Sequence, residues 1–157
     1  MATAKRNNVF LSHSDRDRAF VLKLAGVLKR HGVKFWYSGA DIVGAQQWHD
    51  EIGRALANCN WFLLILTPHS VRSEWVKREL FFALDQQRYR NRIIPLLRKP
   101  CDASKLSWTL NSFERVDFTG DFDEGCRQLL RVWNIEWKPE KHSATSNATK
   151  KKIEVNL

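Results

Sequence analysis

The chain has 157 residues, enough for one domain with a core of ordinary size. Hydrophobic residues make up 43% of it, close to the globular average, which excludes a disordered or fibrous class. The formal net charge is +9, but Lys and Arg are scattered along the chain, so an attraction to anionic cofactors is a better expectation than nucleic-acid binding.

Five short apolar runs are predicted to be strands, and helical patterns alternate with them. The runs span 9–11, 33–37, 61–66, 93–97 and 113–118. The first, third and fourth are apolar throughout, as in strands covered by helices on both faces. The fifth alternates between apolar and polar residues, as an edge strand does.

Helical patterns fill the intervals between these runs. They cover 15–31, 48–56, 73–84 and 122–132, with only a weak signal over 99–111. Gly32 is expected to stop the first helix, and Ser70 to act as N-cap of the third. The alternation predicts an α/β fold in which helices sandwich a parallel sheet through right-handed crossovers.

One domain with two extensions is expected. Residues 1–7 are an N-terminal extension, 8–137 the domain, and 138–157, rich in Lys, Ser, Thr and Asn, a flexible basic tail. No apolar run is long enough to span a bilayer, and the first residues lack the apolar segment of a signal peptide. Three cysteines without metal-like spacing indicate a reducing compartment, so a cytoplasmic protein is expected.

Polar segments rich in Ser, His and Asp follow the first three predicted strands, where an open parallel sheet binds its ligands. They are 12–17, 38–44 and 67–70. The sequence contains no phosphate-binding glycine loop, no metal motif and no nucleophile elbow. Because His13, Ser14 and Asp17 crowd into one loop, helix capping is the simpler interpretation of these three residues.

Glu79, on the edge of the apolar face of the third helix, is the strongest candidate for chemistry. The residues three and four positions from it are Trp75, Val76, Phe82 and Ala83, and none is cationic. A carboxylate held against aromatic surface without a cation indicates a site whose ligand supplies the positive charge. The alternative is a partly exposed glutamate that pairs with a distant Arg or Lys.

Four segments in order resemble the motifs of a bacterial-type Toll/interleukin-1 receptor (TIR) domain. They are VFLSHS at 9–14 followed by Asp17, VKFWY at 33–37, IVG at 42–44 and SEWVKREL at 73–80. The resemblance runs from about Asn8 to Trp133. It implies a flavodoxin-like three-layer sandwich with a five-stranded parallel sheet, and a mobile loop over 38–45. Bacterial members commonly place an Asp directly after the Trp-Tyr pair, where this chain has Ser38.

The resemblance also implies that Glu79 corresponds to the glutamate that carries NAD⁺ cleavage in enzymatic TIR domains. The chemistry suits a single carboxylate, because the leaving nicotinamide is neutral and a carboxylate beneath the ribose can stabilise the oxocarbenium-like transition state. Trp75 could stack on a base or on nicotinamide, or be an aromatic at the edge of the core. Phe10, Ser14 and Asp41 are weaker candidates for the nicotinamide–ribose pocket, by position alone.

An NAD⁺ nucleosidase or ADP-ribosyl cyclase is therefore expected, which releases nicotinamide and forms ADP-ribose or a cyclic isomer in bacterial immune signalling. NAD⁺ is then the substrate, and no cofactor or metal is expected. The expected partners are further copies of the chain and other TIR-domain or signalling proteins. The alternative is a non-enzymatic scaffold or effector that acts through TIR–TIR association.

Overall fold

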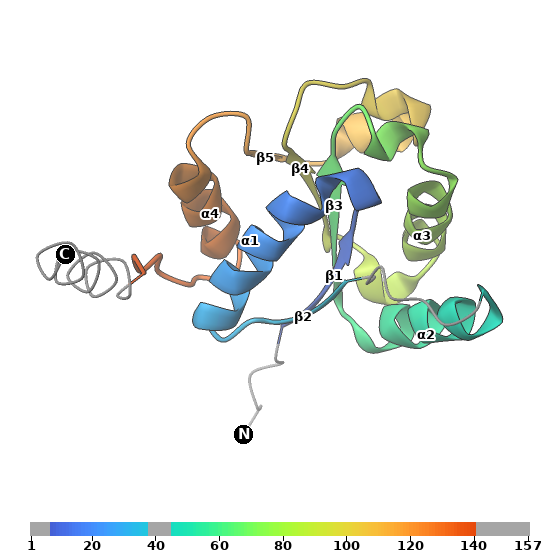
Figure 1. Cartoon of the computed structure of the whole chain (residues 1–157), viewed down its shortest axis with the longest axis horizontal. Helices are drawn as coiled ribbons and strands as arrows, with labels where there is room; N and C mark the ends of the chain where they lie inside the picture. The colour runs from blue at the N-terminus through green and yellow to red at the C-terminus, as the bar shows by residue number, and fades with distance from the viewer. Residues whose placement is uncertain (1–6, 38–44, 141–157) are drawn as a thin grey trace, which may run out of the picture.

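A parallel five-stranded sheet forms the centre of the part of the chain that the computed structural model describes, residues 7–37 and 45–140, with only the backbone described in 45–49. The strands lie in the order β2-β1-β3-β4-β5 (Figure 1). They are β1 (Asn8–Ser12), β2 (Lys34–Tyr37), β3 (Trp61–Leu66), β4 (Ile93–Leu97) and β5 (Val116–Asp117). The predicted parallel sheet is confirmed, and β2 is one of its two edges.

Helices cover both faces of the sheet, which makes the three layers of the predicted sandwich (Figure 1). They are α1 (Arg18–Arg30), α2 (Ala45–Asn58), α3 (Glu74–Leu84) and α4 (Phe122–Arg131). α1 and α4 lie on one face, and α2 and α3 on the other. Gly32, with φ of 77°, follows α1 in the left-handed conformation, as its predicted role as a helix stop requires.

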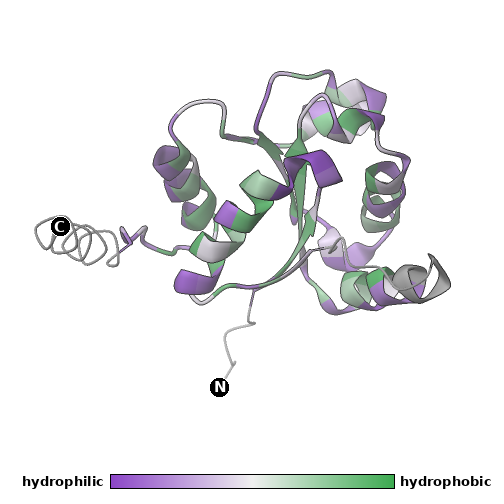
Figure 2. Ribbon diagram, in the orientation of Figure 1, coloured by the Kyte–Doolittle hydropathy of each residue, from purple (hydrophilic) through white to green (hydrophobic). Residues whose placement is uncertain are grey.

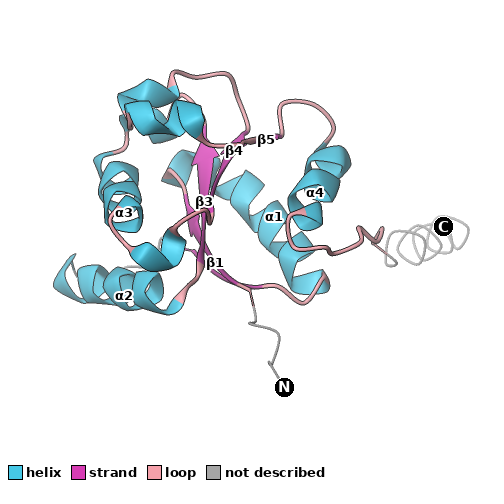
Figure 3. Cartoon of the chain, turned by 180° about the vertical axis from the view of Figure 1, so that it is seen from behind, coloured by secondary structure: helices cyan, strands magenta, loops and turns pink. Residues whose placement is uncertain are grey.

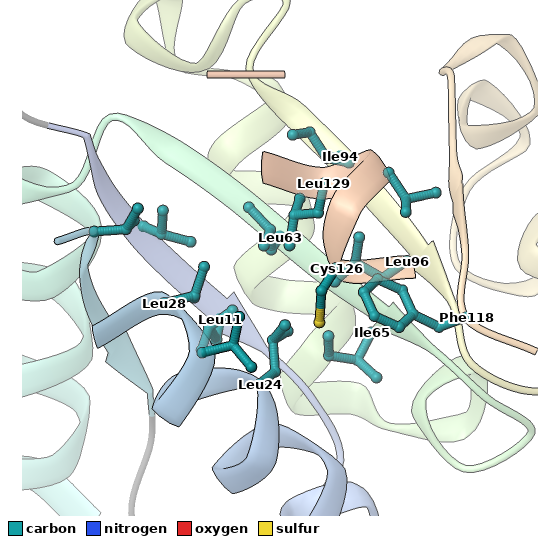
Figure 4. Close-up of a cluster of buried hydrophobic side chains, with 14 of the residues drawn as sticks. Leu11, Leu24, Leu28, Leu63, Ile65, Ile94, Leu96, Phe118, Cys126 and Leu129 are labelled. Carbon is teal, nitrogen blue, oxygen red and sulfur yellow. The ribbon is translucent and has the colours of Figure 1, made fainter. Parts of the chain in front are cut away.

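The core consists of two apolar layers, one on each face of the sheet. Figure 2 shows the central strands predominantly hydrophobic, as expected for strands buried on both faces. Alternate residues of a strand contribute to opposite layers: Phe10 of β1 packs toward α2 and α3, and Leu11 packs toward α1. Figure 4 shows the layer on the side of α1 and α4, to which Leu24 and Leu28 of α1 and Leu129 of α4 all contribute.

Two predicted elements differ from the structure. The N-cap of α3 is Ser73, whose hydroxyl accepts a hydrogen bond from the Val76 amide at 3.2 Å. Ser70 instead begins a short 3₁₀ turn, because its hydroxyl is engaged with the backbone of Thr67. The fifth strand is only two residues long, since the carboxylate of Asp117 accepts hydrogen bonds from Thr119 and turns the chain there.

The weak helical signal over 99–111 corresponds to two 3₁₀ turns, Ala103–Lys105 and Trp108–Ser112. Asp102 and Ser107 cap these turns with their side chains. Figure 3 shows this segment from behind, above α3 and beyond the end of β3. The turns therefore stand near the carboxyl edge of the sheet, where β1 and β3 also end.

Candidate functional site

Glu79 is buried, with only 4% of its surface exposed. It lies on α3 beside the inward stripe of Val76, Leu80 and Ala83, which packs against the sheet. Burial excludes the alternative of a partly exposed surface glutamate. In the described residues no Lys or Arg forms an ion pair with it, so the carboxylate is buried without a positive partner there.

One oxygen of Glu79 is held by Ser12, the last residue of β1. The Ser12 hydroxyl donates a hydrogen bond of 2.7 Å to Oε1, and Ser12 is itself 1% exposed. The other oxygen, Oε2, is buried and accepts no hydrogen bond from any residue in 7–37 or 45–140. Ser12 thus fixes the orientation of a carboxylate that keeps one oxygen for another donor or a cation.

This environment changes the acidity of Glu79. Burial raises the pKa of its carboxyl from 4.5 to about 8, because the charged form loses its hydration. The hydrogen bond from Ser12 acts in the opposite direction, and the nearby negative charge of Asp15 adds to the increase. A cation bound beside Oε2 would favour the ionised form, so the site is suited to a positively charged ligand.

A buried hydrogen bond joins the loops that follow β1 and β3. The hydroxyl of Thr67 donates to Oδ2 of Asp17 at 2.6 Å, and it accepts from the backbone amides of His69 and Ser70 at 3.2 and 3.1 Å. Both Asp17 and Thr67 are buried. The pair therefore fixes the end of β1, which carries Ser12, relative to the turn that leads into α3.

His13 is buried next to Ser12 but lies on the opposite face of the sheet. Its Nδ1 is 3.3 Å from the Leu11 carbonyl, and its ring meets the edge of Tyr37 with 6.2 Å between centroids. Burial lowers the pKa of the imidazole and so favours the neutral ring. Since Tyr37 packs in the layer of α1 and α4, His13 belongs to that layer rather than to the surroundings of Glu79.

Phe10 and Ser14, two of the residues predicted to contact the substrate, make contacts within the protein. Phe10 is fully buried, and its ring stacks between those of Trp36 and Phe62, at centroid distances of 5.1 and 5.6 Å. It is a core residue in this structure, because an apolar side chain in the middle of a central strand is covered by helix. The Ser14 hydroxyl accepts a hydrogen bond from the Arg16 amide at 3.3 Å, so the capping interpretation holds for Ser14, whereas the Asp17 side chain makes no capping bond and is bonded to Thr67.

Trp75 lies one helical turn before Glu79. It is half-buried at the edge of the layer formed by α2 and α3, and the guanidinium of Arg78 lies 5.8 Å from its ring. Asp41 and the predicted mobile loop lie outside the described residues. Sequence reasoning missed Ser12 and Thr67, although both stand in the polar segments that follow β1 and β3.

A flavodoxin-like sheet and a buried glutamate near the ends of its strands together define a class of domain. The sequence comparison identifies that class. Residues 9–130 match the profile of the TIR domain, and the chain belongs to this family. Among curated relatives, the NAD(+) hydrolase PdTIR of Paracoccus denitrificans (strain Pd 1222) is 25% identical over 138 residues, which cover 84% of this chain and 46% of the relative.

The 2′ cyclic ADP-D-ribose synthase BtTIR of Bacteroides thetaiotaomicron is 27% identical over 77 residues, which cover 48% of this chain and 27% of that protein. The matches thus span less than half the length of both relatives. Among solved structures, the TIR domain of the Toll-related receptor TRR-2 from Hydra magnipapillata superposes with a TM-score of 0.65 at 24% identity, covering 79% of this chain and 95% of that one. This likeness confirms the predicted fold.

Two further properties concern the described part of the chain. Its helices include none long and apolar enough to cross a membrane. Its His, Cys, Asp and Glu side chains form no group of three that could hold a metal ion.

Proposed function

We propose that this chain cleaves the nicotinamide–ribose bond of NAD⁺ and that Glu79 is its catalytic residue. The observation that carries the proposal is the buried carboxylate, held through Oε1 by Ser12, with no positive partner in the described residues. The names of the bacterial relatives, an NAD(+) hydrolase and a 2′ cyclic ADP-D-ribose synthase, support the same reaction class.

NAD⁺ supplies the charge that the site lacks. Its nicotinamide ring is cationic, and binding it near Glu79 would favour the ionised carboxylate although burial raises the pKa of this residue to about 8. When the C1′–N bond breaks, both bonding electrons leave with nicotinamide, which becomes neutral and needs no general acid. The ribose then carries the positive charge, and Oε2 of Glu79 stabilises it.

The same cation leads to either product. Water that adds to C1′ and loses a proton to solvent gives ADP-ribose, and attack by a group of the substrate itself gives a cyclic isomer. We place the reaction in the cytoplasm and in bacterial immune signalling, with assembly into TIR–TIR contacts as the activating step.

Nicotinamide release from NAD⁺ tests this function. We expect Glu79→Gln, which keeps the shape but not the charge, to lower kcat/KM by about 100-fold or more. Glu74→Gln on the same helix is the matched control, because Glu74 is exposed, and it should retain wild-type activity. Activity that survives in Glu79→Gln would show that another residue carries the reaction.

A second candidate function is a binding module that acts through TIR–TIR association without turnover. Exposed aromatic rings favour it: Phe81 and Phe82 on α3 are 49% and 41% exposed, and Trp108 is 80% exposed. Wild-type protein that releases no nicotinamide over a wide range of protein concentrations, yet associates with itself, would support the module and contradict the enzyme. Specific activity that rises with protein concentration would instead show an enzyme activated by assembly.

A further inference from the structure

A hollow lies beside the amino end of β1 and along most of the edge strand β2. It has a volume of about 730 Å³ and is bounded by Asn8 at the start of β1, by residues 33–36, most of which belong to β2, and by the C-terminal half of α2. β1 runs from Asn8 to Ser12, so roughly 13 Å of strand separates Asn8, at one end of this cleft, from the Ser12–Glu79 pair, and the other end reaches Trp36, which is in register with Phe10. Its volume falls within the range of small-molecule sites, about 300–1,000 Å³.

Three cations from three different elements line this cleft. They are Lys29 of α1, Lys34 of β2 and Arg54 of α2, and one carboxylate, Glu51 of α2, accompanies them. None of these four side chains forms an ion pair within 7–37 or 45–140. The cleft therefore carries an excess of positive charge that no protein group in this part of the chain compensates, and an anionic ligand would be attracted to it.

An aromatic ring stands beside these cations. Side chains alternate along β2, and Trp36 packs on Phe10 in the layer of α2, with 5.1 Å between ring centroids. Lys34, two residues earlier, projects to the same side. Trp36 is half-buried and lines the cleft, so its lining combines an aromatic side chain with those of lysine and arginine.

We propose that this cleft binds a nucleoside diphosphate, as a site separate from the one around Glu79. Lys29, Lys34 and Arg54 would hold the phosphates, for which cationic donors are the best partners. Trp36 offers its ring to the base, and aromatic stacking is a general means of holding nucleobases. Glu51 would repel a bare phosphate ion, but its carboxylate can accept hydrogen bonds from ribose hydroxyls. The combination selects a nucleotide over a simple anion.

Isothermal titration calorimetry with ADP, pyrophosphate and adenosine as probes tests the site. We expect ADP to bind with one molecule per chain, and each of the other probes to bind at least about ten-fold more weakly, because each makes only part of the contacts. The double variant Lys34→Glu/Arg54→Glu should weaken ADP binding by about 100-fold or more, and Trp36→Leu by about ten-fold.

The matched control is Lys105→Glu/Arg131→Glu, which makes the same change of charge at exposed positions outside the cleft and should bind ADP as the wild type does. Thermal unfolding of each variant verifies that it is folded. Undiminished binding by the cleft variant, or pyrophosphate binding as tight as that of ADP, would overturn the proposal. Loss of ADP binding in Glu79→Gln with retention in the cleft variant would also overturn it, by placing the nucleotide at the site around Glu79. The nucleotide site does not depend on the proposed function. If the chain does not cleave NAD⁺, the same binding results are expected.

Discussion

Glu79 makes the free energy of unfolding depend on pH across the neutral range. Burial raises its pKa from 4.5 to about 8 in the folded chain, and unfolding returns it to its ordinary value. Between the two values the folded state holds a proton that the unfolded state releases. Its contribution to stability is therefore fully present below about pH 4.5 and is lost as pH rises through about 8.

We expect Glu79→Gln, which stays neutral at every pH, to escape this loss. The free energy of unfolding of Glu79→Gln minus that of the wild type should rise by about 1.4 kcal/mol for each pH unit between the two pKa values. Urea unfolding at several pH values between the two pKa values measures this difference. The exposed variant Glu74→Gln is the control, and its difference from the wild type should not change with pH. Parallel pH curves for the wild type and Glu79→Gln would contradict the raised pKa.

Ser12 sets how readily Glu79 ionises. The hydrogen bond from its hydroxyl lowers the pKa of Glu79 against the effect of burial, so Ser12→Ala should raise that pKa further above 8. If the reaction needs the ionised carboxylate, the rise of kcat/KM with pH moves to more alkaline values. Activity near neutrality then falls about ten-fold for each pH unit by which the profile moves. The pH profile of nicotinamide release measures this movement.

Ser14→Ala is the control for Ser12→Ala, because the Ser14 hydroxyl caps a turn by accepting from the Arg16 amide, whereas the Ser12 hydroxyl donates to the carboxylate. A Ser12→Ala variant with lower activity but an unchanged pH profile would show that Ser12 supports the fold of the site without adjusting the charge of Glu79.

At the scale of elements, the sequence correctly predicts the strands and helices whose ranges depend on local patterns. β3 and β4 match the predicted ranges, because continuous apolar runs are found where helices cover both faces of a strand. The predicted N-cap of α3 is wrong, since Ser70 and Ser73 are both good caps by residue type and the Ser70 hydroxyl is engaged with the backbone of Thr67, three residues before it.

The candidate site is predicted less completely for a related reason. Glu79 can be selected because its helical neighbours are visible in the sequence. Its partner Ser12 is 67 residues away, and Asp17 and Thr67 are 50 residues apart. No local pattern encodes such pairs, which form only when the sheet brings the ends of β1 and β3 together.

The packing of α4 on the sheet depends on the missing side chain of Gly125. A Cβ at this position would lie 2.5–2.9 Å from ring atoms of Phe118, a fully buried residue of the layer shown in Figure 4. Gly125→Ala should therefore destabilise the domain by about 1–3 kcal/mol, because neither the ring nor the helix can move freely in a packed core.

Gly26→Ala on α1 is the matched control for Gly125→Ala. A Cβ there has no atom within 4 Å, so the substitution should stabilise the helix by roughly 0.4–1 kcal/mol. Urea unfolding of the two variants measures both effects. Equal effects of the two substitutions would show that Phe118 yields to the added methyl group.

At the scale of the whole molecule, two places on one sheet carry different chemistry. The carboxyl edge presents a buried acid that lacks a cation, and the cleft along β2 presents cations in excess over the one carboxylate beside them. A net charge of +9 therefore does not describe either site. A cationic ring suits the first site, and phosphates suit the second.

A segment that follows α4 returns to α1. Trp137 stacks on His31 with 5.4 Å between centroids, and the Lys138 amide donates to Nε2 of that ring at 3.0 Å. Arg30 donates to the Lys138 carbonyl at 3.1 Å. Ile135 packs with Trp137 on the layer of α1 and α4. These contacts extend to Lys138.

A chain that ends at 133 should therefore be less stable than one that ends at 140 by about 2–4 kcal/mol, through the lost burial of Ile135 and Trp137. Trp137→Ala in the full chain separates packing from chain length and should account for most of this loss. Equal stability of the chains that end at 133 and 140 would mean that α4 completes the domain, and that the stacking on His31 adds nothing to the free energy of folding.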